Sequence, residues 1–299
     1  MNFEIWGLSG SLHTEREDQM AHAEQRLWYW IAQFDGACNR FRSDSEISRL
    51  NASPTGTYAI SETFELALAG ALRAGRATDG LCDPTVLPAL LALGYDRDYG
   101  ELLRRDQNNG HDPVKPLGLG AICLDRDAHT VSLAPDCQLD LGASAKALTV
   151  DFVANEIGST GGVVVEIGGD VAARGKSAEG PWAIGISDTL TTNGREPRVS
   201  VDRGGIATSS LTTRTWRIGD RVANHIIDPR TGSFAKGIYS TATVSAESCL
   251  MANAFSTAAL LWGEDAGYYI GQAGWSARLV RADGTAEFVG GWPRDGERS

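Results

Sequence analysis

Cysteine is scarce in this sequence, and long apolar runs are absent. Five cysteines occur among 299 residues, an odd number, and no C-x-x-C motif is present. This usage predicts isolated, reduced thiols and excludes a cysteine-based zinc site. No run of about 18 apolar residues occurs, so no transmembrane helix is expected. Residues 1–7 lack a basic segment followed by an apolar one, so we expect no signal peptide or lipoprotein cysteine, and a cytoplasmic protein.

Positive charge is also in deficit. The chain has 27 Lys and Arg against 38 Asp and Glu, which gives a formal net charge of −11. Such a chain repels phosphate backbones, which argues against nucleic-acid binding. A small anionic ligand is still compatible, because a helix N-terminus or a metal ion supplies local positive potential. With 42% hydrophobic and 22% charged residues the composition is that of a globular protein, and the length allows one large domain or two.

The spacing of apolar residues predicts helices mixed with short strands. Leu27, Trp30, Ile31 and Phe34 follow the helical period, for example, whereas residues 163–167 form a short apolar run typical of a buried strand. Helices are expected over 16–37, from the stretch 43–46 through 50, over 61–76, from 84 onward, over 144–157 and over 245–262. Strands are expected over 1–14 (a short strand and turn), 122–133 (a hairpin), 163–167, 182–187, 198–202, 222–232 (ending in a turn), 241–245, 277–281 and 286–289, with loops over 100–118 and 187–197. Because the two patterns mix without a strict βαβ rhythm, we expect an α+β fold.

Polar residues predict where several helices begin. Ser43-Asp44-Ser45-Glu46 reads as a capping box that opens a short helix through Leu50, and Ser61 as the cap of the next helix. Asp83-Pro84 places a proline at the first position of another helix, and Ser245 is the expected cap of the helix that ends at Trp262.

Two glycine-containing stretches are candidates for ligand binding. In Leu139-Asp140-Leu141-Gly142-Ala143-Ser144-Ala145-Lys146, a turn of small residues enters a helix with a lysine one turn in, an arrangement that can hold phosphates. The alternative is an ordinary strand-to-helix turn with a surface lysine. In Glu166-Ile167-Gly168-Gly169-Asp170, paired glycines after a buried strand allow close approach of a ligand, or simply form a turn with a capping Asp.

Two polar pairs are further candidates. His225 and Asp228 lie near the ends of an expected strand beside the turn Pro229-Arg230-Thr231-Gly232, where a structural histidine is the alternative. Asn253 and Thr257 are four residues apart on an expected helix, so their side-chain oxygens face the same way. Such oxygens can help to ligate a hard cation, although ordinary helix polarity explains them equally.

Taken together, six segments in order resemble the ApbE family of FAD:protein FMN transferases, from Trp6 to about Gly263. The matching segments are Arg42-Ser43-Asp44-Ser45-Glu46-Ile47-Ser48-Arg49-Leu50-Asn51, Asp79-Gly80-Leu81-Cys82-Asp83-Pro84-Thr85-Val86, Leu139-Asp140-Leu141-Gly142 with Ala145-Lys146, Ile167-Gly168-Gly169-Asp170, Gly205-Ile206-Ala207-Thr208-Ser209, and His225-Ile226-Ile227-Asp228-Pro229-Arg230-Thr231-Gly232. The resemblance implies an α+β, ApbE-like (T-fold-like) architecture of mixed sheets covered by helices. It implies one domain over residues 1–299, with a frayed tail from about residue 293.

The resemblance also implies an activity. Family members bind FAD with Mg²⁺, transfer FMN to a Thr or Ser hydroxyl of a target protein and release AMP, and some chiefly hydrolyse FAD to FMN and AMP. It places the metal at the Ala143 carbonyl and the side chains of Asn253 and Thr257. It places the flavin contacts at Trp6, Phe41, Leu81, Cys82, Asp83, Asp140, Lys146 and His225.

Catalytic roles are expected from the chemistry of these residues. Lys146 would stabilise the negative charge that develops on the phosphate oxygens. His225 or Asp228 would remove the proton of the acceptor hydroxyl. The expected partners are therefore FAD and a protein that carries an acceptor Thr or Ser, with no nucleic acid and no membrane insertion.

The sequence departs from the family pattern at the metal site. The family's metal-ligating Asp, in an Ala-Asp-Ala-x-Ser-Thr run, is Asn253 here, and the usual Gly after the lysine is Ala147. Asn keeps a carbonyl oxygen but removes one negative charge, so we expect weaker Mg²⁺ binding, mainly when FAD supplies phosphate oxygens. The alternatives to FMN transfer are therefore an FAD pyrophosphatase and an FAD-binding protein whose catalysis is weakened.

Overall fold

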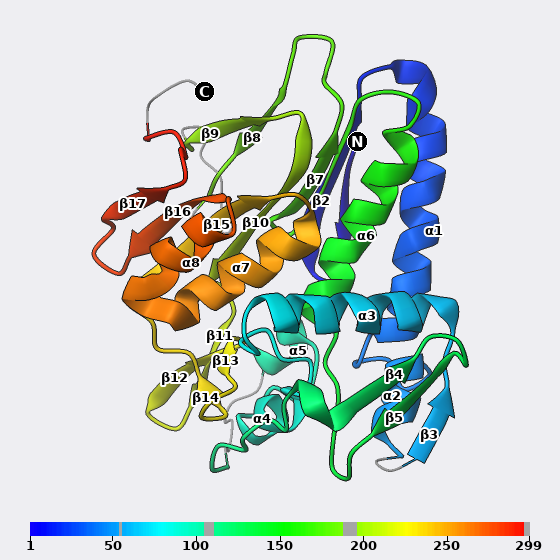
Figure 1. Cartoon of the computed structure of the whole chain (residues 1–299), viewed down its shortest axis with the longest axis vertical. Coiled ribbons are helices and arrows are strands. Elements are labelled where there is room, and N and C mark those ends of the chain that lie inside the picture. The colour runs from blue at the N-terminus through cyan, green and yellow to red at the C-terminus, as the bar shows by residue number, and fades with distance from the viewer. Residues whose placement is uncertain (54–55, 105–110, 188–195, 296–299) are drawn as a thin grey trace. The chain divides into compact units, whose positions relative to one another are not determined.

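The computed structural model describes residues 1–53, 56–104, 111–187 and 196–295, and the chain forms two compact units (Figure 1). Unit 1 comprises Met1–Trp30, Lys146–Thr213 and Lys236–Ser299, and unit 2 comprises Ile31–Ala145 and Arg214–Ala235. The divisions fall within helices α1 (Met20–Cys38) and α6 (Gly142–Ile157). The expectation of one domain over residues 1–299 stays a prediction.

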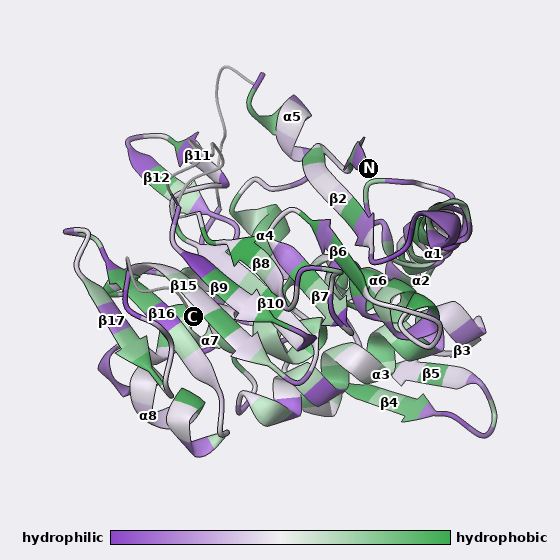
Figure 2. Cartoon of the chain, turned by 90° about the horizontal axis from the view of Figure 1, so that it is seen from above, coloured by the Kyte–Doolittle hydropathy of each residue, from purple (hydrophilic) through white to green (hydrophobic). Residues whose placement is uncertain are grey.

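Unit 1 is built on an eight-stranded sheet whose neighbouring strands pair antiparallel. In spatial order the strands are β1 (Asn2–Ile5), β2 (Leu8–Thr14), β6 (Val163–Ile167), β7 (Asp170–Arg174), β10 (Arg203–Ser210), β15 (Tyr239–Ala246), β16 (Ser276–Arg281) and β17 (Ala286–Val289). Figure 2 shows hydrophobic segments along β6 and β10, as expected for central strands that are covered by other elements.

Helix α7 (Cys249–Trp262) packs on β10 and β15, and α8 (Ala266–Gln272) lies over β16 and β17 after the 3₁₀ turn η3 (Gly263–Asp265). Gly205 on β10 permits the close approach of α7, since a Cβ there would lie 2.1 Å from the backbone nitrogen of Cys249. The hairpin of β8 (Trp182–Gly185) and β9 (Arg198–Val201) adds Val199 to a buried cluster with Val164, Ile206 and Trp292. The turn η1 (Glu17–Gln19) leads into α1.

Unit 2 combines short helices with small antiparallel sheets. Its helices are α2 (Glu46–Asn51), α3 (Glu62–Ala77), α4 (Leu87–Ala92) and α5 (Tyr99–Leu102), with the 3₁₀ turn η2 (Leu119–Ala121). Its strands are β3 (Gly56–Ala59), β4 (Ile122–Asp125) and β5 (Thr130–Leu133) in one sheet, the pair β11 (Thr215–Ile218) and β12 (Arg221–Asn224), and the pair β13 (Ile227–Asp228) and β14 (Ser233–Phe234). The α4 face, Tyr95 and Trp216 share one buried core.

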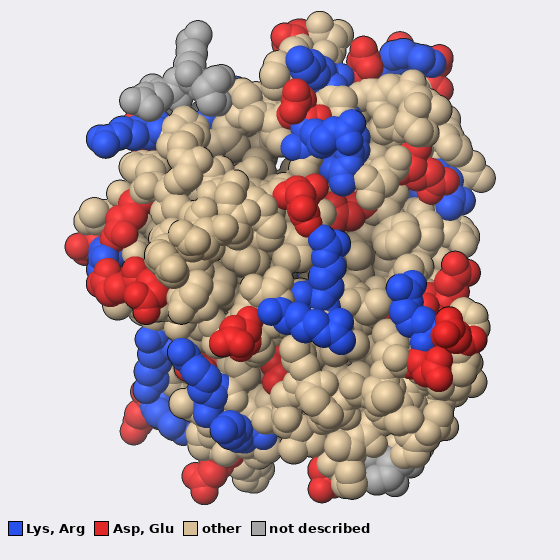
Figure 3. Space-filling model, viewed as in Figure 1, with Lys and Arg blue, Asp and Glu red and all other residues tan. Residues whose placement is uncertain are grey.

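The α+β class is confirmed, and most elements lie where the apolar pattern predicts them. Ser61 caps α3 by accepting the Phe64 N–H at 3.1 Å, as expected. The tail strands also form the predicted hairpin around Asp283-Gly284. Figure 3 shows basic and acidic side chains next to one another on the face in view, in keeping with the many surface ion pairs of this acidic chain.

Two predicted helix caps are wrong. The cap of α2 is Ser45, whose Oγ accepts the Ser48 N–H at 3.2 Å, and not Ser43. The cap of α7 is Ser248, because Ser245 is still paired in β15, which continues to Ala246. In both cases the hydroxyl of the capping serine accepts the N–H three residues further along the chain, which the helix itself leaves unpaired.

Three predicted elements also end or begin elsewhere. Helix α4 begins at Leu87 rather than at Pro84, because the Thr85 N–H and hydroxyl turn back to the Asp83 carboxylate at 2.8 Å each. The expected strand over 222–232 is interrupted after Asn224, and α5 occupies the start of the expected loop over 100–118. Residues 105–110 and 188–195 of the two expected loops lie outside the described residues.

Asp151 on α6 joins that helix to the start of α7 within unit 1. Its two carboxylate oxygens accept the N–H groups of Cys249 and Leu250, each at 2.9 Å. Burial raises the pKa of Asp151, and the two backbone N–H donors oppose that rise. The carboxylate therefore satisfies two N–H groups that the helix itself leaves unpaired.

Replacement of Asp151 by Ala is expected to lower the free energy of unfolding by about 3 kcal/mol, because it leaves two buried backbone N–H groups without an acceptor. Urea denaturation measures this loss. Asp151→Asn is the matched control, since it keeps the shape and one acceptor and should lose less. A loss below about 0.5 kcal/mol for Asp151→Ala would contradict the role assigned to this carboxylate.

Candidate functional site

In unit 2, three sequence-distant motifs meet at the segment Leu139–Asp140. The Asn51 side chain clamps this segment, because its Nδ2 donates to the Leu139 carbonyl and its Oδ1 accepts the Leu139 N–H, both at 2.8 Å. On the next residue, the Asp140 N–H donates to the Pro84 carbonyl at 2.9 Å. The structure thus brings Asp140 to the turn that carries Leu81, Cys82 and Asp83.

Asp140 also fixes the start of α6. Its Oδ1 accepts the Gly142 N–H at 2.8 Å, and its Oδ2 accepts the Arg40 Nε–H at 2.8 Å. Ala143 and Lys146 follow on the first turns of the same helix. The small-residue stretch is therefore a helix entry, as predicted, with an ion-paired carboxylate directly before it.

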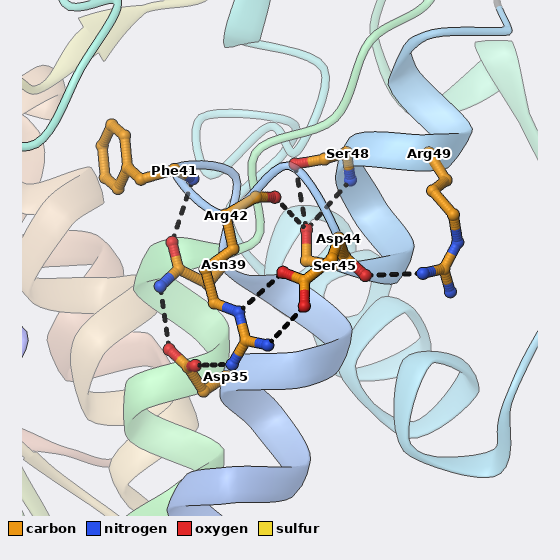
Figure 4. Close-up of polar contacts among 8 residues, drawn as sticks. All are labelled: Asp35, Asn39, Phe41, Arg42, Asp44, Ser45, Ser48 and Arg49. Atoms are coloured by element: carbon orange, nitrogen blue, oxygen red, sulfur yellow. Dashed lines mark hydrogen bonds and ion pairs between the residues drawn. The ribbon is translucent and has the colours of Figure 1, made fainter.

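Phe41 is held by the polar network that precedes α2 (Figure 4). The Asn39 Oδ1 accepts the Phe41 N–H at 2.9 Å, and the Asn39 amide nitrogen donates to Asp35 at 2.8 Å. Arg42 binds both oxygens of Asp44, at 3.0 and 2.9 Å. Asn39 thus fixes the backbone at Phe41, whose ring is 40% exposed, and the Arg42–Asp44 pair is a structural contact of the adjoining motif.

The predicted flavin contacts Leu81, Cys82 and Asp83 lie on a tight turn after α3. The Thr78 hydroxyl accepts the Cys82 N–H at 3.1 Å. Leu81 and Asp83 are buried, whereas Cys82 is half-buried. Burial raises the pKa of the Asp83 carboxyl, and hydrogen bonds from Thr85 oppose the rise. The Asp83 side chain therefore serves to shape this turn.

His225 and Asp228 do not lie on one strand, contrary to the prediction. Asn224 ends β12, because its Oδ1 accepts the Ile226 N–H at 3.1 Å and its Nδ2 donates to the Ala235 carbonyl at 3.0 Å. The half-buried His225 sits in the resulting bend, and Asp228 follows on β13. Burial would raise the pKa of Asp228, but the hydrogen bonds from Arg230 outweigh burial and hold that pKa below its ordinary value.

In unit 1, Lys146 and Asn253 meet at one buried carboxylate. Asp170 follows the Gly168-Gly169 turn at the start of β7 and is 1% exposed. The Lys146 Nζ donates to its Oδ2 at 2.8 Å, and the Asn253 Nδ2 donates to its Oδ1 at 2.8 Å. Both oxygens of the buried carboxylate are thereby paired, by one cation and one neutral amide.

The donors around Asn253 and Thr257 fit a hard cation in chemical type, though not in charge. Because the Asn253 amide nitrogen faces Asp170, its carbonyl oxygen is directed away from that carboxylate. Thr257, one turn along α7, hydrogen-bonds the Ser209 hydroxyl at 3.0 Å. Neutral oxygens are acceptable Mg²⁺ ligands, but among the described residues no cluster of three His, Cys, Asp or Glu side chains is arranged to hold a metal. Ala143, the third predicted ligand, belongs to unit 2, so the joint metal site stays a prediction.

Trp6 occupies an unfavourable backbone position in unit 1. The two-residue loop Trp6-Gly7 joins β1 to β2, with Ile5 paired to Leu8. Trp6 has a φ of 53° and Gly7 a φ of 69°. Such two-residue hairpin loops favour Asn-Gly, and a positive φ is uncommon for a bulky residue. Strain of this kind at a half-buried tryptophan is consistent with its predicted role as a ligand contact.

Several residues that shape these sites were not among the sequence predictions. Asn51 and Asp170 were quoted only as parts of motifs, and Arg40 and Asn224 were not singled out at all. Asp170 follows paired glycines after a buried strand, which could have marked it as a buried carboxylate in need of a cation. For Arg40 and Asn224 no local signal exists, because their partners lie far along the chain or in an irregular bend.

Comparison with known proteins agrees with this arrangement. The family model described as "ApbE family" matches residues 7–277. A protein of Haemophilus influenzae named FAD:protein FMN transferase is 30% identical over 235 residues, covering 75% of this chain and 68% of that protein. A Vibrio cholerae protein of the same name is 30% identical over 241 residues, covering 78% and 71%.

Solved structures share the fold. A Thermotoga maritima ApbE protein superimposes with a TM-score of 0.78 at 21% identity, over 97% of this chain and 96% of that one. A Pseudomonas stutzeri flavinyl transferase ApbE in its apo form gives a TM-score of 0.77 at 23% identity, over 97% and 92%. The chain therefore shares the fold of these ApbE structures, and the family-model match over residues 7–277 shows that it belongs to the ApbE family. In the described part of the chain, no helix is long and apolar enough to cross a membrane.

Replacement of Trp6 separates backbone strain from ligand binding. Trp6→Asn and Trp6→Ala both remove the indole, but Asn tolerates the left-handed backbone and Ala does not. We therefore expect the Asn variant to be about 1 kcal/mol more stable than the Ala variant, while both lose FAD affinity. Chemical denaturation and quenching of FAD fluorescence measure the two effects. Equal stability of the variants would show that the turn is unstrained, and unaltered FAD affinity would remove Trp6 from the ligand contacts.

Replacement of Asn253 by Asp tests the charge at the metal site. In protein without Mg²⁺ it places a second carboxylate against Asp170, so we expect a loss of about 1–3 kcal/mol in unfolding free energy. Mg²⁺ should reverse this loss, and should bind the variant more tightly than the wild type in calorimetry. Asn253→Ala is the matched control, which should lose stability without rescue. An Asn253→Asp variant that is as stable and as insensitive to Mg²⁺ as the wild type would contradict this account.

Proposed function

We propose that this protein is an FAD:protein FMN transferase that moves FMN from FAD to a Thr or Ser hydroxyl of an acceptor protein and releases AMP. The family match over residues 7–277, together with relatives named for this activity, is the observation that carries the proposal. A flavin site is further supported by the meeting of the Asn51, Pro84 and Asp140 segments in unit 2.

The reaction exchanges one bond to phosphorus for another. The acceptor oxygen forms a bond to the phosphorus of the FMN half, the bond from that phosphorus to the bridging oxygen breaks, and AMP leaves. Lys146, which is 23% exposed beside Asp170, faces the phosphates and stabilises the charge that develops on their oxygens. The flavin half is held by Trp6, Phe41, Leu81, Cys82, Asp83, Asp140 and His225.

The proposed metal site comprises the Ala143 carbonyl, Asn253 and Thr257. Mg²⁺ held there supplies additional electrostatic stabilisation of the phosphate oxygens. Because the side-chain donors are neutral, this chain depends on the phosphates of FAD to complete the ligand set.

His225 is the proposed base that takes the proton of the acceptor hydroxyl. Asp228 is the weaker candidate, because Arg230 occupies both of its oxygens and keeps its pKa low. A good general base has a pKa near the working pH, which an ordinary histidine satisfies.

The neutral Asn253 favours two alternative functions. In one, water replaces the acceptor hydroxyl, and in the other, the protein binds FAD without turnover. An FAD pyrophosphatase would release FMN and AMP, and a catalytically weakened protein would only bind FAD. The proposed location is cytoplasmic, which is supported by the finding that none of the five cysteines, all of which the structure describes, forms a disulfide.

Incubation with FAD, Mg²⁺ and candidate acceptor proteins distinguishes the three activities. Covalent flavin fluorescence on an acceptor band after denaturing electrophoresis, with an equal amount of AMP, is the expected result. Free FMN and AMP would indicate hydrolysis, and intact bound FAD would indicate binding alone. Lys146→Met is the matched negative control, since it should abolish AMP release.

The pH dependence of transfer identifies the base. If His225 is the base, protonation of its imidazole removes the acceptor for the hydroxyl proton, so the rate falls on acidification. Because the pKa of Asp228 lies below its ordinary value, an Asp228 base would stay deprotonated in mildly acidic solution and keep the rate constant there. We expect His225→Asn to lower kcat about 100-fold or more, and Asp228→Asn to lower it less. The opposite order of effects would assign the role to Asp228.

A further inference from the structure

Arg40 is a buried cation beside two of the proposed flavin contacts. Its side chain is 7% exposed, and its Nε donates to the Asp140 Oδ2 at 2.8 Å. The guanidinium carbon lies 4.1 Å from the centre of the Phe41 ring and 4.7 Å from that of Tyr95. One carboxylate and two aromatic faces therefore fix the direction of the guanidinium.

One donor of this guanidinium is unused. The Nη2 of Arg40 is buried, and no atom among the residues that the structure describes accepts its hydrogens. Buried N–H groups are ordinarily paired, so the unused donor indicates that an acceptor arrives with a ligand. Asp140 does not supply that acceptor, since its oxygens receive the Arg40 Nε–H and the Gly142 N–H.

The cover over this guanidinium is partly exposed to solvent. The Phe41 ring that lies against it is 40% exposed, and it packs at a tilted angle 5.8 Å from the Tyr95 ring. Tyr95 in turn packs on the buried Trp216 at 5.2 Å, so this side of the cluster is anchored in the core. A flat ligand that displaces or stacks on Phe41 can therefore reach Nη2, while Tyr95 keeps the guanidinium in place.

We propose that Arg40 is a binding and specificity-determining residue, whose Nη2 donates a hydrogen bond to a ring carbonyl oxygen of the isoalloxazine. This inference rests on the proposed function. The pyrimidine edge of isoalloxazine carries carbonyl oxygens, which a guanidinium recognises well, whereas adenine carries none. Arg40 thus selects the flavin half of FAD for the Phe41–Asp140 cluster of unit 2.

The test compares a ligand with the flavin ring alone and a ligand with adenine alone. Riboflavin, AMP and FAD are titrated by fluorescence or calorimetry into the wild type, Arg40→Met and Arg40→Lys. We expect Arg40→Met to weaken riboflavin and FAD binding tenfold or more while AMP affinity stays within twofold. Arg40→Lys keeps the charge beside Asp140 but not the planar fork, so it should weaken riboflavin binding less. We also expect the absorption spectrum of riboflavin to shift on binding to the wild type, and this shift should be lost with Arg40→Met.

The matched control is Arg76→Met, which removes an exposed arginine of α3 and makes the same change in net charge. It should leave all three affinities unchanged. Unaltered riboflavin affinity in Arg40→Met overturns the inference but not the proposed function. An equal loss of riboflavin and AMP shows a merely structural role and also overturns it.

Two further outcomes are decisive. If Arg40→Met does not fold, Arg40→Lys decides, because it retains the pair with Asp140. A selective loss of riboflavin affinity in that variant supports the inference, and unchanged affinity overturns it. If the wild type binds neither riboflavin nor FAD, the inference and the proposed function fail together.

Discussion

The clamp of Asn51 on Leu139 is the interaction on which the candidate site depends. It fixes the backbone directly before α6, and Asp140 then binds Arg40 on one side and the first N–H of the helix on the other. Since Ala143 follows on the first turn of this helix within unit 2, its position is determined by this entry. A buried amide with two strong hydrogen bonds is well suited to this task, because either bond lost would leave an unpaired group inside the protein.

The charges of the candidate residues are balanced in pairs within each unit. Lys146 is neutralised by Asp170, and Arg40 by Asp140. In unit 1 the amide of Asn253 completes the pairing of Asp170 without adding a charge. An Asp at this position would make two carboxylates compete for one lysine unless a cation were bound. Because Asn253 is neutral, the buried Asp170 carboxylate is stable without a metal ion. The same neutrality weakens the attraction of these residues for a metal ion.

Local signals explain what could be predicted from the sequence. Ser61 and the apolar period define α3, and Asp283-Gly284 defines the last hairpin, because both depend on residues close together in the chain. The cap at Ser248 and the start of α4 at Leu87 could not be predicted in this way, since strand pairing of β15 and the Asp83–Thr85 turn decide them. The partners of Asp170 lie 24 and 83 residues away, and Arg40 lies 100 residues from Asp140. The sequence motifs identify the segments that carry the candidate residues. Which side chains in those segments contact one another depends on tertiary structure and could not be predicted.

The acidity of the chain bears on how a diphosphate would bind. A net charge of −11 repels an anion at long range, and the lysine and the buried arginine of the site are already paired with carboxylates. The remaining local attraction comes from the N–H groups at the start of α6, which are polar but uncharged. A dinucleotide that arrives with its own bound cation avoids this deficit, because the complex carries less negative charge than the free ligand. If FAD binds as proposed, the cation binds together with the substrate rather than to the free protein, because Asn253 is neutral and Lys146 is already paired.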